Sequence, residues 1–411
     1  LKRSAEHGCR EAQNTLGDKL QFGDASMGIE QDCIKAVQWY IKSASQGLFR
    51  AQWRLAKCYQ DGIGVPQNPA EAFKCYKLSA NQGDAISMYD LGWCYENGFG
   101  TEPNMIETIK WYKLSAEKGN NCAQNNLANC YFNGMGVEQN YEEAVKWYKL
   151  ASEQGNSLSQ NNLANCYYNG NGVKQDYEEA VRWYEKSVEQ GCHWAQCNLA
   201  NCYRFGKGVQ VDCDKAIELY KEAIKQGNIN ALERLKNMAE DDAFASYTLA
   251  KCYHFGDCVE KDNESAMRFY CLSAQNGNNQ ALECLKEMAE SDNAWAKYYL
   301  GYFYYWEFIF DDKMRAKAIE LYKSSANIGC IRAMSGLAFH YRDINDALAE
   351  RWYKQAVDSS TNNKDRCRAI EELADFYEYR DKFSAEKCWK EALSLGSTIA
   401  EIHLKELRKS N

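Results

Sequence analysis

Residues 123–131 read AQNNLANCY, residues 159–167 read SQNNLANCY, and residues 195–203 read AQCNLANCY. The three stretches are followed, 32 residues after their first residue, by Gly155, Gly191 and Gly227. Gly47, Gly83 and Gly119 extend this series towards the N-terminus, and all six glycines stand 36 residues apart. A fixed period of this length is the signature of a repeat architecture, in which each unit buries its apolar side against its neighbours.

Each 36-residue interval contains two helical patterns. The first places Ala, Leu, a small residue and Tyr at offsets 0, 4, 5 and 8, which lie on one face of an α-helix. A glycine loop follows, such as GNGV at residues 170–173, because a tight turn between helices needs positive φ. The second pattern begins at Asp32, Asn140, Asp176 or Asp212, where a helix N-cap belongs. The sequence therefore predicts one antiparallel helix pair per repeat.

These segments resemble the SEL-one-like repeat family, the glycine-loop branch of the tetratricopeptide clan. The resemblance implies an all-α fold, a right-handed α/α superhelical solenoid of antiparallel helix pairs with a concave inner surface. It also implies an adaptor or scaffold that binds a peptide or protein partner along that surface and assembles a complex. The family's known roles include protein quality control and bacterial proteins that act on host cells. We expect a cytoplasmic location, in the protein's own cell or in a host, because cysteines at a buried repeat position fit thiols that are kept reduced.

The regular repeats are expected over residues 9–227. Residues 228–329 contain two similar inserts, at 231–238 and 281–288, each of which predicts an extra short helix. Residues 330–396 are expected to form tetratricopeptide-like hairpins without the glycine loop, and residues 397–411 a capping helix. Residues 1–8 align with the end of a second helix, so we expect the chain to begin inside a repeat of a longer protein.

Charge and composition argue against several other functions. The formal net charge of −8 is unfavourable for binding a nucleic-acid backbone or an anionic bilayer, and no run of 18 apolar residues predicts membrane insertion. The five histidines are scattered, and no serine or cysteine nucleophile has a recognisable partner motif. We therefore predict that the chain is not an enzyme and that it has no catalytic residue, metal site or cofactor.

The chain has 19 cysteines, an odd number. Six of them recur beside the core tyrosine of the first helix, namely Cys58, Cys94, Cys130, Cys166, Cys202 and Cys252. Successive stacked helix pairs lie on the order of 10 Å apart, too far for these thiols to converge on one metal ion. Secreted members of the family have a cysteine pair that bridges each repeat, but the second cysteine does not recur here. We predict buried, reduced thiols.

Two rows of first-helix residues are candidate partner-binding sites. Offset 6 of successive repeats contains Lys57, Trp93, Asn129, Asn165, Asn201 and Lys251. Offset 3 contains Asn126, Asn162 and Asn198. In relatives of the clan the first helix lines the concave face, and asparagine can both donate to and accept from an extended peptide backbone. The alternative is that these amides bridge neighbouring helices.

A second candidate lies at residues 302–310, which read YFYYWEFIF. This segment starts as a first helix and then replaces the glycine loop with Trp306, Phe308 and Phe310. These aromatic side chains either fold back onto the neighbouring repeat or form an exposed apolar patch that binds a partner or a second copy of the chain.

Two other functions remain alternatives to an adaptor. The chain could be a structural subunit that forms oligomers, or the interaction module of a longer protein whose catalytic domain lies outside this sequence.

Overall fold

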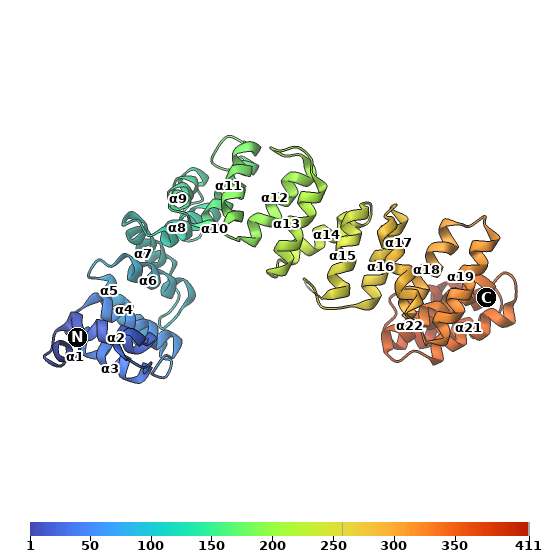
Figure 1. The fold of residues 1–411 in the computed structure, drawn as a ribbon, viewed down its shortest axis with the longest axis horizontal. Coiled ribbons are helices and arrows are strands. Elements are labelled where there is room, and N and C mark those ends of the chain that lie inside the picture. The colour runs from blue at the N-terminus through green and yellow to red at the C-terminus, as the bar shows by residue number, and fades with distance from the viewer. Residues whose placement is uncertain (257, 410–411) are drawn as a thin grey trace. The chain divides into compact units, whose positions relative to one another are not determined.

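The computed structural model describes residues 1–256 and 258–409 of the chain. Over these residues the protein has 24 α-helices and one short 3-10 helix (Figure 1). No β-strand occurs among them beyond a single bridge between Asp24 and Ile29. None of the described helices has both the length and the apolar character needed to cross a membrane. The all-α fold predicted from the repeat is therefore confirmed.

The chain divides into two units, residues 1–216 and residues 217–411. Unit 1 opens with α1 (Lys2–Glu6) and then alternates first and second helices. Its first helices are α2 (Arg10–Phe22), α4 (Phe49–Asp61), α6 (Ala85–Asn97), α8 (Asn121–Asn133), α10 (Ser157–Asn169) and α12 (His193–Phe205). Its second helices are α3 (Cys33–Ser45), α5 (Pro69–Ala80), α7 (Met105–Glu117), α9 (Tyr141–Glu153) and α11 (Tyr177–Glu189). The 3-10 helix, η1 (Ala25–Met27), lies between α2 and α3.

The boundary between the units falls within α13 (Cys213–Lys225). Unit 2 continues with α14 (Ile229–Ala239), α15 (Ala243–Phe255), α16 (Asn263–Gln275), α17 (Asn279–Glu290), α18 (Ala294–Glu307) and α19 (Asp312–Asn327). It ends with α20 (Ile331–Tyr341), α21 (Asp346–Asp358), α22 (Asn363–Glu378), α23 (Lys382–Ser394) and α24 (Ala400–Lys409). Helices α14 and α17 lie at the two inserts and stand outside the alternation of first and second helices.

Local sequence determines where the helices of a pair begin and end. The Asp176 carboxylate accepts a hydrogen bond from the backbone N–H of Glu179 at 3.0 Å and so caps α11. Asp32, Asn140 and Asp212 cap their helices in the same way, which confirms the predicted N-caps. Each such cap contributes about 1 kcal/mol to helix stability.

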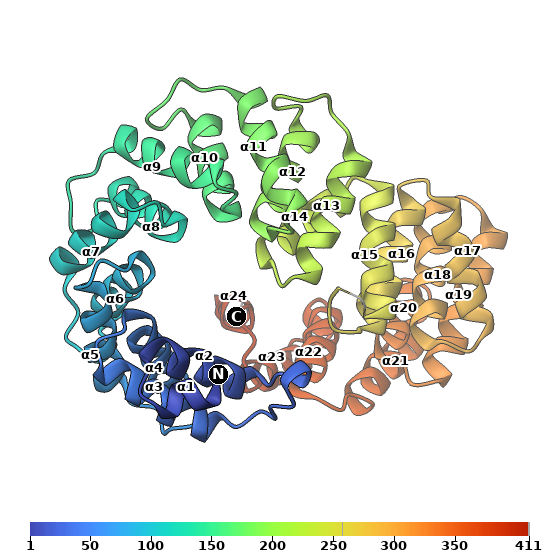
Figure 2. The ribbon, with the colours of Figure 1, turned by 60° about the vertical axis from the view of Figure 1, so that its left-hand side comes forward.

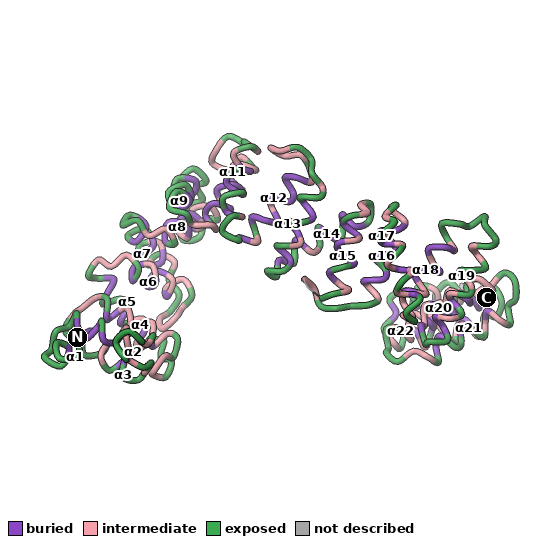
Figure 3. The backbone as a smooth tube through the Cα atoms, viewed as in Figure 1, coloured by how far each residue is buried: buried purple, intermediate pink, exposed green. Residues whose placement is uncertain are grey.

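Each repeat buries its own apolar stripe. Leu127 and Ala128 of α8 are fully buried, as is Tyr112 of α7. The equivalent residues of the next pair, Leu163 and Ala164, are also fully buried. Figure 3 shows buried residues distributed along both helices of every pair rather than gathered at one centre. The core is thus continuous through stacked repeats, as expected for a solenoid.

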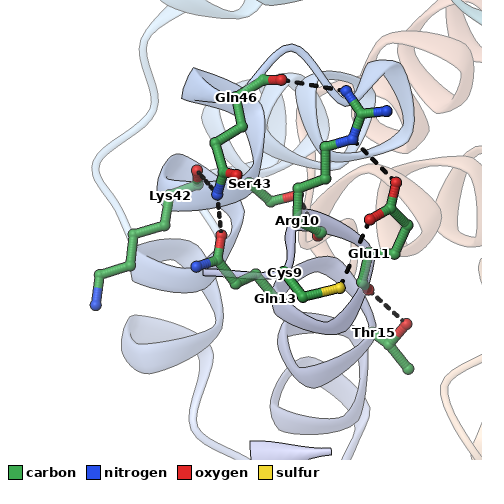
Figure 4. A network of polar contacts seen from close by, with 8 residues as sticks. All are labelled: Cys9, Arg10, Glu11, Gln13, Thr15, Lys42, Ser43 and Gln46. Carbon is green, nitrogen blue, oxygen red and sulfur yellow. Dashed lines mark hydrogen bonds and ion pairs between the residues drawn. The ribbon is translucent and has the colours of Figure 1, made fainter. Parts of the chain in front are cut away.

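In four helix pairs of unit 1, a serine hydrogen bond joins the two helices at the end where the chain enters the pair. In the first pair Ser43 Oγ donates to the backbone carbonyl of Arg10 at 2.7 Å, and Gln46 Nε2 donates to Gln13 Oε1 at 2.8 Å (Figure 4). Equivalent serine bonds run from Ser79 to Phe49, from Ser115 to Ala85 and from Ser187 to Ser157. These bonds tie the end of each second helix to the start of the first helix of the same pair.

The pair formed by α8 and α9 departs from this pattern. Ala151 stands where Ser115 and Ser187 stand in the neighbouring pairs, and the serine is displaced by one residue to Ser152. The hydroxyl of Ser152 is buried and has no hydrogen-bond partner. A buried hydroxyl without a partner destabilises the folded state by about 1–3 kcal/mol.

Exchanging these two residues should therefore stabilise the protein. We expect the double variant Ala151→Ser with Ser152→Ala to raise the free energy of unfolding by about 2 kcal/mol, since it gains one hydrogen bond and loses one unpaired hydroxyl. Urea unfolding measures the change. Ser152→Ala alone is the control and should recover only part of the gain. A double variant no more stable than the parent would contradict the assignment.

The second glycine of each loop contacts the helix pair before it. A Cβ atom on Gly172 would lie 2.3 Å from the carbonyl oxygen of Tyr141, the first residue of α9. Gly208 approaches the Tyr177 carbonyl equally closely. In unit 2 this loop position is occupied by Cys258, which forms a disulfide with Cys252 of α15. The close approach of loop to neighbouring helix is thus a property of the regular repeats.

Candidate partner-binding surfaces

The first helices of unit 1 lie on the inner side of its curve. Figure 2 shows α6 and α8 there, with α5, α7 and α9 on the outer side. The offset-3 and offset-6 residues belong to these first helices. The hydrogen bonds that their side chains form within the protein determine which donors and acceptors are left for a ligand.

The offset-6 asparagines accept hydrogen bonds from two directions. Asn129 Oδ1 accepts from the Tyr148 hydroxyl at 2.5 Å and from Asn162 Nδ2 at 3.4 Å. Tyr148 belongs to the same helix pair, whereas Asn162 belongs to the next one. The carbonyl oxygen of Asn129 therefore joins two helices of one repeat to the first helix of the following repeat.

The same arrangement recurs one repeat later. Asn165 Oδ1 accepts from the Tyr184 hydroxyl at 2.5 Å and from Asn198 Nδ2 at 3.2 Å. Asn201 is buried, and its amide donates to the Cys197 carbonyl at 2.9 Å. The three asparagines thus take part in hydrogen bonds within the protein.

The offset-3 asparagines supply the donors of this network. Asn162 Nδ2 also donates to Asn125 Oδ1 at 3.3 Å, and Asn198 Nδ2 donates to Asn161 Oδ1 at 3.0 Å. Asn126 Nδ2 donates to the Tyr112 hydroxyl at 3.3 Å. These contacts are the helix-bridging arrangement that the sequence left open as an alternative. A role for the two rows in binding a peptide remains a prediction.

The residues at the N-terminal end of the row are also engaged. Lys57 Nζ lies 3.5 Å from Asp90 Oδ1, and the Trp53 indole donates to Asp90 Oδ2 at 2.7 Å. Burial raises the pKa of Asp90, although Lys57 acts in the opposite direction. Trp93 is half-buried and packs against Phe99 with ring centroids 5.4 Å apart. Lys251 belongs to unit 2, is exposed, and lies over the Tyr247 ring at 5.6 Å.

The aromatic segment of unit 2 differs from its predicted form in one respect. Helix α18 continues to Glu307, so Trp306 lies in its last turn and not in a loop. Trp306 packs against Tyr305 at 5.4 Å and against Phe339 of α20 at 6.1 Å between ring centroids. The helix runs on because Glu307 stands where the regular repeats have the glycine that ends the first helix, as Gly134 does after α8.

Part of this segment folds back and part of it is exposed. Phe308 packs against Phe303 and Tyr304 at 6.1 and 6.2 Å between ring centroids. Trp306 and Phe308 nevertheless remain 42% and 40% exposed, and Phe310 is 99% exposed. We use the name aromatic patch for the exposed residues of this segment together with the exposed Phe339 of α20, namely Trp306, Phe308, Ile309, Phe310 and Phe339.

A pocket of about 250 Å³ adjoins this patch. Its wall is aromatic and is formed by Tyr298, Tyr302, Tyr305, Trp306, Tyr322 and Phe339. Its polar lining includes Arg332, Ser335 and Glu372. The residue pattern alone did not predict this pocket. The helical spacing of Tyr298, Tyr302 and Tyr305 was the available signal, but that spacing also fits an ordinary buried helix face.

The cysteine prediction is wrong at one position. Cys252 is bonded to Cys258 and is not a free thiol. Cys58, Cys94, Cys130, Cys166 and Cys202 are buried free cysteines. Burial raises the pKa of the Cys130, Cys166 and Cys202 thiols to about 12, so the reactive thiolate is scarce at neutral pH. A disulfide partner that recurred in every repeat would be visible as a periodic pattern in the sequence. Cys258 occurs in a single repeat and gives no such pattern.

Three side chains near the C-terminus bring possible metal-ligand atoms within 4.8 Å of one another, namely Asp375, Glu378 and His403. His403 Nδ1 lies 2.7 Å from Glu378 Oε1, and its ring stacks on Trp389 with centroids 4.3 Å apart. The hydrogen bond to Glu378 and the stacking on Trp389 account for the position of His403, and we assign no metal to this group.

The repeats match a known family model. The Sel1 repeat model matches nine segments, at residues 10–48, 49–84, 85–120, 123–156, 157–192, 195–228, 243–278, 296–330 and 332–360. These segments cover most of the chain. No curated protein sequence matches it.

Solved structures show the same architecture. The protective antigen c5321 of uropathogenic Escherichia coli, which displays an SLR fold, is 26% identical over all of this chain and 90% of its own, with a TM-score of 0.54. A Sel1 repeat protein from Oxalobacter formigenes is 30% identical over 65% of this chain and 98% of its own, with a TM-score of 0.50. The repeat period, the helix pairs and the family match agree, and the chain belongs to the Sel1 repeat family.

Proposed function

We propose that the chain is a non-catalytic adaptor that binds a polypeptide partner and assembles a complex. Sel1 repeat proteins are typically scaffolds for protein–protein interaction and are generally not catalytic. The aromatic patch of unit 2 is the primary contact in this proposal. The first-helix surface of unit 1, with its half-buried amides, is a second and more polar one.

The exposure of the aromatic patch is the observation that carries the proposal. Single large apolar side chains on a surface are ordinary, whereas five exposed ones on one segment and on the helix that Trp306 contacts favour an interaction site. Trp306 and Phe339 contact each other across two helices, and Phe310 projects into solvent with almost no burial. Aromatic residues of this kind supply most of the affinity of protein interfaces.

The free buried thiols support a reducing compartment as the place of action, the cytosol of the protein's own cell or of a host. The disulfide between Cys252 and Cys258 is a feature that counts against a reducing compartment, because an oxidising compartment would favour it.

The test replaces Trp306, Phe308 and Phe310 together by serine. We expect the full chain to bind members of a random peptide array. The triple variant should lose about thirtyfold or more in affinity for them, because the loss of even one interface hot spot costs about 2 kcal/mol or more. Helix content measured by circular dichroism should be unchanged. Phe383→Ser is the matched control, since Phe383 is an exposed phenylalanine of α23 in the same unit.

Two results would contradict the proposal. Unfolding of unit 2 in the triple variant would show that these side chains belong to the core. Concentration-dependent dimerisation of the parent in sedimentation velocity, lost in the triple variant and without peptide binding, would favour the oligomerising structural subunit instead.

A further inference from the structure

Rings from four helices, α18, α19, α20 and α21, line the pocket beside the aromatic patch. Tyr298, Tyr302, Tyr305 and Trp306 project from α18, with 6.1 Å between the centroids of Tyr302 and Trp306. Tyr322 comes from α19 and lies 6.2 Å from Tyr305. Ring faces carry partial negative charge, and a cation within about 6 Å of a ring centroid is attracted to it. The wall of the pocket therefore favours a positively charged group.

The polar lining of the pocket has the complementary charge. Glu372 of α22 lines it, and the Oε2 atom of this carboxylate is buried without a hydrogen-bond partner. Burial raises the pKa of Glu372, against the opposing effects of the Ser335 hydroxyl and the Arg368 and Arg332 guanidinium groups. The negative charge of Asp375, on the same helix, also raises the pKa of Glu372. The cost of burial thus exceeds the stabilisation that the two guanidinium groups give to the charged carboxylate.

Neither nearby arginine is committed to Glu372. Arg332, which lines the pocket, forms an ion pair with Glu264 at 2.6 Å. Arg368 pairs with Asp365 at 3.4 Å. Arg342 lies over the ring of Phe339 at 5.6 Å. Each of the first two guanidinium groups therefore has another carboxylate as its ion-pair partner, while Nε of Arg332, like Oε2 of Glu372, is buried without a hydrogen-bond partner.

The volume of the pocket limits the ligand. Sites for drug-sized ligands and cofactors enclose about 300–1,000 Å³. A pocket of about 250 Å³ is smaller than these, and it opens beside exposed residues of the aromatic patch. It suits one side chain of a larger molecule that lies across the patch.

We propose that this pocket binds a basic side chain, arginine or lysine, of the partner polypeptide, with the rings of α18 and Tyr322 around the cationic group and the Glu372 carboxylate as its counter-charge. The proposal rests on the proposed function, because it names the anchor by which the aromatic patch recognises its partner. The net charge of −8 also favours the approach of a basic partner.

Isothermal titration calorimetry of the full chain with capped single residues tests the pocket separately from the patch. The probes are N-acetyl-arginine amide and N-acetyl-lysine amide, with the uncharged citrulline and norleucine amides as controls. We expect one or both basic probes to bind and the uncharged ones to bind about tenfold or more weaker, since hydrogen bonds to charged groups are worth 1.5–3 kcal/mol. Uncharged probes that bind equally well would overturn the proposal. Binding of acetate or inorganic phosphate in competition with the basic probes would also do so, because it would assign the site to Arg332 and an anion.

Glu372→Gln is the decisive variant, since it removes the charge and keeps the shape. We expect it to weaken the basic probe about tenfold, whereas Glu371→Gln, one residue earlier on α22, should change the affinity by less than twofold. Because the folded-state pKa of Glu372 is raised, its ionisation opposes folding above pH 4.5, the ordinary value, so Glu372→Gln should melt no lower than the parent at pH 7. A lower melting temperature would mean that the carboxylate is structural.

The two proposals can fail independently. If the basic probes bind but no peptide depends on the aromatic patch, the pocket stands and the adaptor proposal falls. If peptides bind through the patch while Glu372→Gln leaves both peptide and probe affinities unchanged, the pocket proposal alone is wrong.

Discussion

Replacing Gly172 by alanine should lower the free energy of unfolding by about 2–5 kcal/mol. Two costs combine. Gly172 has a φ of +71°, a conformation that costs an L-residue about 1–2 kcal/mol. Its new Cβ would also lie 2.3 Å from the Tyr141 carbonyl oxygen, so the loop must move away from α9. Urea unfolding at constant m-value measures the loss.

Gly155→Ala separates the two costs. Gly155 has a φ of +86°, and a Cβ placed on it meets nothing within 4 Å. This control variant should lose only the conformational part, about 1–2 kcal/mol. Equal losses for the two variants would show that the loop yields without cost and that its contact with the preceding repeat contributes no stability.

The double variant Asn129→Ala with Asn165→Ala should destabilise the protein by about 4 kcal/mol. Each substitution removes an acceptor shared by a tyrosine hydroxyl and the amide of the next repeat. Tyr148 and Tyr184 are 3% and 2% exposed, so their hydroxyls would be left with little access to water. Unfolding in urea, followed by circular dichroism, gives the magnitude.

The matched control uses two asparagines one turn further along the same helices. Asn133 and Asn169 are exposed, and their amides donate only to carbonyls of their own helices at 3.0 and 2.9 Å. Asn133→Ala with Asn169→Ala should change the stability by less than about 0.5 kcal/mol. A double variant at Asn129 and Asn165 that is as stable as this control, yet has lost peptide binding, would instead make the row a ligand site.

The repeat itself was predictable because its signals are local. The N-caps at Asp32 and Asp176 and the glycines that end the first helices, such as Gly134 and Gly170, act within a few residues of their own position. The same signals recur in every copy of the repeat. Helices α14 and α17 likewise lie where amphipathic inserts occur in the sequence. Such features need no knowledge of which repeats touch.

The candidate sites were less predictable because they depend on contacts between distant segments. Whether Asn129 faces a ligand or Tyr148 is decided by the angle between two helices, which residue spacing does not specify. The pocket requires Glu372 of α22 to meet rings of α18, two helix pairs earlier in the chain. A disulfide confined to one repeat, between Cys252 and Cys258, leaves no periodic signal at all.

The contact between a loop glycine and the carbonyl of the preceding pair gives every junction in unit 1 the same two matching ends. Removing or duplicating one whole block, for example residues 121–156, would join ends that already fit, and Gly172 or its counterpart would still face a helix start. Loss of a single loop residue would instead shift the glycine away from that carbonyl. An array built this way can change its length by entire 36-residue blocks, so that the number of repeats varies more easily in evolution than the length of any one of them.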